Sequence, residues 1–254
     1  MGKEVQQAWS ATTQVLFGKA LGRLEDYEEW LKLNVPGMLA SKSAISDKIV
    51  YIPNFIYYAE TQKQAIKLEE TDEWGKKHLE KAEAEGLSLS NAAGKLGSLK
   101  YFSPEVAMGF NVGLEECSVY FNSSYCFKTS AMVADKYCAY SMWPRNSEYI
   151  FGSSYVFSCS FCVKCYHSEN LTRCFEVSNS SNCADCYFCH NCENVRDSMF
   201  CFNAKNLRHA IGNVELGKEQ YAEIKKLLLS DLAKRLENNK GLKHSIYNIG
   251  CFKK

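Results

Sequence analysis

Two properties that the sequence lacks narrow its class first. No run of 18 apolar residues occurs in the 254-residue chain, and its first residues lack the apolar core of a secretion signal. The formal net charge is only +1, which argues against bulk attraction to nucleic acid or to an anionic membrane. We therefore expect a cytoplasmic protein without a membrane span, with neither a membrane nor a nucleic acid as its partner.

Familiar catalytic signatures are also absent. The chain contains no Walker loop, no GxGxxG dinucleotide turn, no GxSxG elbow and no HExxH helix. The sequence therefore predicts a protein that is not an enzyme. Any chemistry would have to come from outward residues that no motif describes.

Cysteine, in contrast, is abundant and regularly spaced. Of the 13 cysteines, all but Cys251 have residue numbers divisible by three. Independent placement would give this agreement about once in a hundred thousand trials, so a repeat explains it better. From Leu114 to Ala210 the sites in this phase carry mostly Cys, Ser, Ala, Val, Leu or Ile, and Asp135 is the only charged residue among them. A column that excludes charge over such a length faces an interior, and its small side chains make that interior narrow.

A spacing of three fits a backbone that turns a corner every three residues. Two outward columns set the coil length at 12: an aromatic or aliphatic column beside the central cysteine, and a column of asparagines. A rival period of nine fits Cys165 to Cys201 but leaves the asparagine column unexplained. We predict a mainly β protein built on a narrow β-solenoid of about eight 12-residue coils. Its predicted core includes Cys126, Cys138, Cys162, Cys174 and Cys186.

Asparagine suits a corner because it tolerates tight-turn dihedral angles, and stacked asparagines can hydrogen-bond as a ladder. The predicted corner ladder consists of Asn146, Asn170, Asn182, Asn194 and Asn206. The aromatic column has two interpretations: the N-terminal region covers it, or it forms an exposed patch for a partner. Its members are Phe127, Phe151, Phe175 and Tyr187.

The segments before and after the repeat are predicted to cover the two ends of the solenoid, which would otherwise be open strand edges. We divide the chain into a helical or mixed N-terminal cap domain (1–100), the solenoid (101–212) and a C-terminal capping helix with a tail (213–254). Apolar spacing predicts helix over 1–33, over 71–85 and from Gly217 to about Asn238. Residues 49–58 are typical of a strand with a bend at Pro53, and 245–252 could form a short strand.

Two resemblances follow from these motifs. The triplet of Cys, Ser and Ala in 12-residue coils resembles the solenoid of insect hyperactive antifreeze proteins, over about residues 114–210. That resemblance implies the fold only, because those proteins bind ice through outward Thr-x-Thr rows and Thr172 is nearly the only outward threonine here. Segments 183–194 and 211–221 resemble uncharacterised cysteine-rich triplet-repeat proteins of small-genome archaea and bacteria, a group that implies no activity.

The cysteines allow a sharper interpretation as ligands of zinc or an iron–sulfur cluster. We favour packing without a cofactor, because the three-residue spacing belongs to the whole array and Ser or Val fills the same sites elsewhere. Structural disulfides are a third alternative. If a metal binds, its ligands would come from Cys159, Cys162, Cys165, Cys174, Cys183, Cys186, Cys189 and Cys192.

The sequence thus predicts a non-enzymatic structural scaffold or macromolecule-binding solenoid. Its partner would be another protein or a macromolecular assembly, and the chain could also bind copies of itself as a homo-oligomer. A metal or iron–sulfur protein is the first alternative. A virion or shell component that assembles through the solenoid ends is the second.

Overall fold

The computed structural model describes residues 1–251 and divides the chain into two compact units. Residues 1–37 belong with the chain from Met108 onward, and Met38–Ala107 forms the other unit. The expected cap of residues 1–100 therefore differs from the observed division. Its first 37 residues form helices that bury their apolar faces on the solenoid, while the following 70 residues make their own contacts.

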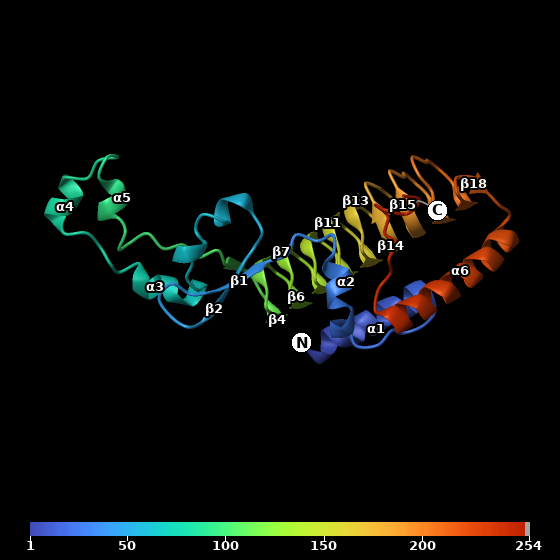
Figure 1. Ribbon diagram of the computed structural model, residues 1–254, viewed down its shortest axis with the longest axis horizontal. Helices are drawn as coiled ribbons and strands as arrows, with labels where there is room; N and C mark the ends of the chain where they lie inside the picture. The colour runs from blue at the N-terminus through green and yellow to red at the C-terminus, as the bar shows by residue number, and fades with distance from the viewer. Residues whose placement is uncertain (252–254) are drawn as a thin grey trace. The chain divides into compact units, whose positions relative to one another are not determined.

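The solenoid confirms the predicted fold class, with about nine parallel coils of 12 residues. Ile150 pairs with Cys162, and Cys162 with Cys174, so equivalent residues stack one coil apart (Figure 1). One series of strands comprises β4 (Val112–Glu115), β6 (Ser124–Phe127), β8 (Lys136–Ala139), β10 (Glu148–Phe151), β12 (Ser160–Val163), β14 (Thr172–Ser178), β15 (Ala184–His190), β16 (Arg196–Met199) and β17 (Arg208–Ile211). The alternate series comprises β3 (Ala107–Met108), β5 (Ser118–Phe121), β7 (Ser130–Val133), β9 (Met142–Arg145), β11 (Ser154–Phe157) and β13 (Tyr166–Glu169).

The predicted corner every three residues is visible in the backbone. From Glu116 to His209 one residue in three has a positive φ, for example Asn170 at 52° and Arg173 at 52°. Such left-handed residues are uncommon outside glycine and asparagine, because the Cβ atom crowds the following carbonyl. Here tyrosine, tryptophan and valine also adopt them, so the stacked coils impose the conformation on side chains that do not favour it.

The interior side chains complete the hydrogen bonding of these corners. The Cys186 thiol donates to the carbonyl oxygens of Ala184 and Val195, each at 3.3 Å. The hydroxyl of Ser153 accepts the backbone N–H of Cys165 at 3.0 Å, one coil further on. Small side chains with an S–H or O–H group therefore do more than fill space, which explains why Cys and Ser prevail over Ala in this column.

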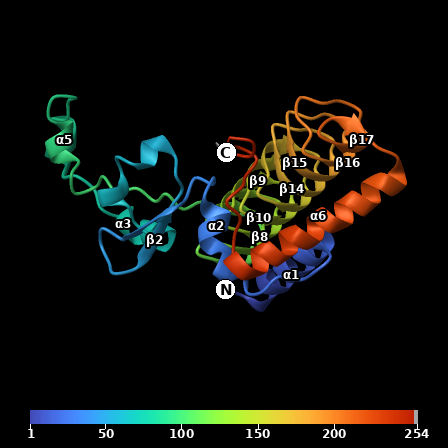
Figure 2. The ribbon, with the colours of Figure 1, turned by 45° about the vertical axis from the view of Figure 1, so that its right-hand side comes forward.

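Helices cover one side of the solenoid, as Figures 1 and 2 show. Helix α1 (Lys3–Phe17) packs its buried face on the aromatic column, with the Trp9 and Phe151 ring centroids 5.2 Å apart. The Tyr187 hydroxyl donates to the Leu16 carbonyl at 2.8 Å. This column is therefore core rather than a partner-binding patch. η1 (Leu24–Tyr27) and α2 (Glu28–Lys32) follow, so the predicted helix over 1–33 is interrupted where Gly18 adopts a φ of 73°.

At the C-terminal end, a hairpin closes the last coil. Strand β18 (Val214–Glu215) pairs antiparallel with β17, and the Asn213 side chain bonds both backbone groups of Phe202. Helix α6 (Lys218–Asn239) starts and ends where the sequence predicts. It returns along the covered side of the coils beside α1, so the expectation that it caps the solenoid end is wrong (Figure 1). The expected strand over 245–252 is wrong for 245–251, where residues 246–250 form a turn instead, and Phe252 lies outside the described residues. Within this segment the Ile246 N–H bonds Glu176.

The second unit is small and built from short elements. An antiparallel pair, β1 (Leu39–Lys42) and β2 (Ile49–Ile52), ends at Pro53, as the bend there predicts. The helix expected over 71–85 is broken into α3 (Thr71–Trp74) and α4 (Lys81–Glu85), and Trp74 packs on Tyr101 with ring centroids 4.5 Å apart. The remaining elements are η2 (Ile56–Tyr58), η3 (Gln62–Gln64), η4 (Leu68–Glu70) and α5 (Ala92–Lys95).

Candidate functional site

The predicted core cysteines lie inside the solenoid. Cys126, Cys138, Cys162, Cys174 and Cys186 are all 0% exposed and belong to one apolar cluster that runs along the coils. Burial raises the pKa of the Cys138 and Cys162 thiols well above the ordinary value. The Cys138 and Cys162 thiols are therefore protonated hydrogen-bond donors and poor nucleophiles at neutral pH.

The eight cysteines named as metal ligands are all buried. Successive members of the column, such as Cys159, Cys162 and Cys165, come from different sides of a coil, and each donates to a backbone carbonyl. In the narrow interior the Cys162 sulfur also lies within hydrogen-bonding reach of the sulfur atoms of Cys159, Cys165 and Cys174. Within residues 1–251, no three His, Cys, Asp or Glu side chains form a group arranged to hold a metal ion. Residues 12 apart, such as Cys162 and Cys174, pair directly between neighbouring coils.

The asparagine ladder forms along part of its corner. The Asn170 amide donates to Asn182 at 3.1 Å, and Asn194 donates to Asn206 at 3.3 Å. Asn146 occupies the same corner with a φ of 49°, between Ala134 and Ser158, which carry no amide.

A second ladder was missed by sequence reasoning. Asn191 donates to Asn203 at 2.8 Å, on a corner that also includes Asn179. The signal was present in the sequence, because these three residues also recur every 12 positions.

An uncovered side of the solenoid carries two adjacent columns that we call the open face. One column runs through Trp143, Tyr155 and His167, whose rings stack with centroids 5.5 and 4.8 Å apart. The other runs through Phe157 and Glu169, and Figures 1 and 2 show α1 and α6 on a different side. Between the columns is a shallow groove of about 680 Å³ lined by Tyr155, Phe157, His167, Ser168, Glu169, Asn179, Ser180 and Ser181.

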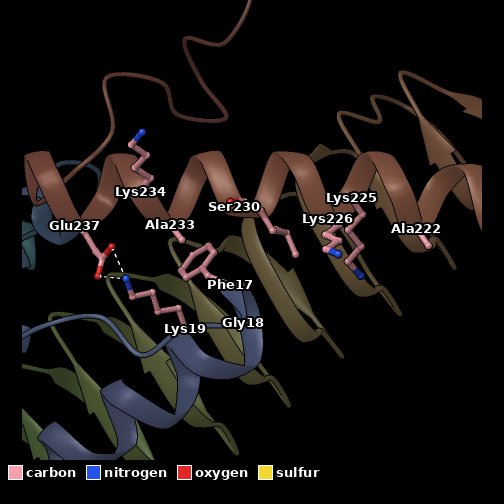
Figure 3. Close-up of a pocket in the computed structure, with 11 residues that line it drawn as sticks. Phe17, Gly18, Lys19, Ala222, Lys225, Lys226, Ser230, Ala233, Lys234 and Glu237 are labelled. Atoms are coloured by element: carbon pink, nitrogen blue, oxygen red, sulfur yellow. Dashed lines mark hydrogen bonds and ion pairs between the residues drawn. The ribbon is translucent and has the colours of Figure 1, made fainter.

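A second groove lies on the covered side, between the end of α1 and one face of α6 (Figure 3). Its volume is about 700 Å³, and its lining combines apolar side chains with lysines. The lining residues are Phe17, Gly18, Lys19, Ala222, Lys225, Lys226, Leu229, Ser230, Ala233, Lys234 and Glu237.

The comparisons with known proteins give no relative. No protein-family model, no curated protein and no solved structure matches the chain. Among the described residues, the helices are too short or too polar to cross a membrane.

Proposed function

We propose that this protein is a non-enzymatic scaffold that binds another macromolecule on the open face of its solenoid. The observation that carries the proposal is the one-sided cover: helices bury one aromatic column, while a second series of aromatic residues stays on an uncovered side (Figure 2). The absence of catalytic motifs in the sequence supports the non-enzymatic part.

The chemistry of the open face suits a protein partner. Trp143 and Tyr155 are half-buried on its surface, and the Arg145 guanidinium lies 5.2 Å from the Trp143 ring centroid. Tryptophan, tyrosine and arginine are the residues that contribute most to protein interfaces. Because the backbone beneath them is held in parallel ladders, binding would order little additional backbone and so lose little backbone entropy.

A comparative pull-down from native lysate tests this proposal. We expect the wild type to retain a partner at near-stoichiometric amounts and the double variant Trp143→Ala/Phe157→Ser to lose it. Thr172→Ala, on the outward side of β14, is the matched control and should retain the partner. Recovery of no stoichiometric partner, together with a monomer by light scattering, would contradict the scaffold.

Two alternatives from the sequence stay predictions. A zinc or iron–sulfur protein would use the interior thiols, and elemental analysis tests it. A virion or shell component would assemble through the solenoid ends, and it would show concentration-dependent growth beyond a dimer in light scattering.

A further inference from the structure

The groove beside α6 exists because α1 ends early. Helix α1 stops at Phe17, where Gly18 takes up a left-handed conformation with a φ of 73°. Helix α6 continues past this point, and its Ala233 packs near Phe17 (Figure 3). One face of α6 is thus left beside the end of a shorter helix, with no third helix along it in residues 1–251.

That face has the regular spacing of a helix-packing stripe. Ala222, Lys226, Leu229, Ala233 and Glu237 recur at intervals of three or four residues and all line the groove. Together they span about 22 Å of helix. Phe17 and Ala233 are buried and form the floor of the groove. Ala222 is exposed and lets another backbone approach closely, and the partly buried Leu229 supplies apolar contact.

The charge around the groove is mainly positive. Lys225 and Lys226 extend from α6 toward the side on which Phe17 lies, whereas Lys234 points the other way (Figure 3). The Lys225 ammonium lies 3.5 Å from Asp197. Lys226 has no ion-pair partner among the described residues, so its charge is available to an occupant.

The other end of the groove is closed by an ion pair. The Lys19 ammonium lies 2.6 Å from a Glu237 carboxylate oxygen, which neutralises the one acidic side chain of the lining.

We propose that this groove is a docking site for an acidic amphipathic helix of a partner protein. A small molecule would leave most of its surface in water here, since the groove is open along its length, and small-molecule sites bury most of their ligand. A helix satisfies its own backbone hydrogen bonds and can place an apolar stripe on Leu229, above the buried floor of the groove. Glutamates beside that stripe would face Lys226. The site adds a second surface to the scaffold and stands independently of the open face.

Two designed peptides test the proposal on the full chain. Both are helical, about 18 residues long, and share one leucine stripe; one carries glutamate beside the stripe and the other carries lysine. By fluorescence anisotropy we expect the glutamate peptide to bind about tenfold or more tightly than the lysine peptide, with a difference that shrinks at high salt. Lys226→Glu should abolish this preference. Lys218→Glu, on the same helix outside the groove, should keep it.

A steric variant separates the groove from general charge attraction. Ser230→Trp should block the glutamate peptide without changing the net charge, and circular dichroism checks that the variant is folded. Equal binding of the two peptides, no binding at about 100 μM, or equal loss in Lys218→Glu would overturn the proposal. So would binding to vesicles of anionic phosphatidylglycerol in place of the peptide. A failed pull-down on the open face leaves these outcomes unaffected, so the two proposals fail separately.

Discussion

The Lys164 ammonium lies 3.8 Å from a Glu176 carboxylate oxygen, and neither side chain is more than 1% exposed. The two residues lie one coil apart on a left-handed corner. Lys164 also donates to the Trp30 carbonyl at 2.9 Å, and Glu176 accepts the Ile246 N–H at 2.9 Å. This buried pair thus ties the N-terminal helices and the C-terminal turns to the same point of the solenoid.

Removing one partner of this pair should destabilise the protein in a pH-dependent way. Burial raises the pKa of Glu176 from its ordinary value of 4.5 to about 7, against the attraction of Lys164. The contribution of Glu176 to the free energy of unfolding is therefore complete below about pH 4.5, and it is lost as the pH rises to about 7. Lys164→Met leaves a buried carboxylate without its cation, so we expect a loss of about 3–5 kcal/mol at pH 8. The loss should be smaller at pH 5, where Glu176 is protonated.

Urea denaturation at both pH values measures this effect. Burial lowers the pKa of Lys164, so the lysine contributes a pH dependence of stability with the opposite sign. The double variant Lys164→Met/Glu176→Gln should recover most of the lost stability, because it leaves no unpaired buried charge. A double variant as unstable as the single one would show that the pair itself is not the cause.

Docking of α2 should depend on a glycine. At Gly152, which has a φ of 61°, an added Cβ would lie 2.8 Å from the Leu31 carbonyl oxygen. We expect Gly152→Ala to cost about 1–3 kcal/mol more than Gly212→Ala in thermal or urea unfolding. Gly212 is the matched control because its φ is 59° and nothing lies within 4 Å of its added Cβ. Equal losses would trace the whole effect to backbone strain.

The thiol hydrogen bonds predict an order of stability at position 186. Cys186→Ala removes both donations to backbone carbonyls, and we expect it to lower the free energy of unfolding by about 1–2 kcal/mol. Cys186→Ser keeps a hydrogen-bond donor and should lower the free energy of unfolding by less. One coil later, the Ser198 hydroxyl donates to a backbone carbonyl in the equivalent way. If alanine is tolerated as well as serine, the thiols act only as apolar filler.

Thiol labelling should separate one cysteine from the other twelve. Cys251 is exposed and the rest are buried, so a thiol reagent should modify one group quickly in the native protein and all 13 in denaturant. Cys251→Ser should abolish the fast phase. Several fast-reacting thiols in that variant would mean that the solenoid opens readily.

Anaerobic purification with elemental analysis tests the interior thiols as ligands. We expect less than about a tenth of an equivalent of zinc or iron, because the thiols donate to backbone carbonyls and no three His, Cys, Asp or Glu side chains within residues 1–251 are arranged to hold a metal ion. A near-stoichiometric metal with a visible absorption band would support the alternative that the cysteine spacing raised.

Sequence reasoning reached the solenoid because its contacts repeat. Each interior residue stacks on the residue 12 positions away, so the same pattern of residue types recurs about nine times along the chain. The second asparagine ladder was within reach by the same count. The groove beside α6 could not be predicted from the repeat, because it depends on where α1 ends relative to a helix about 200 residues later in the chain.

The sequence alone determined the coil length, the phase of the interior and the corner every three residues, since these are periodic and local to neighbouring coils. Only the tertiary structure decided which outward columns are covered. Trp9 contacts Phe151 across about 140 residues of chain, and a single long-range contact of that kind produces no repeat in the sequence. The left-handed corners at Tyr155 and Trp143 were likewise decided by stacking, because the ladders on both sides outweigh what those residues prefer by themselves.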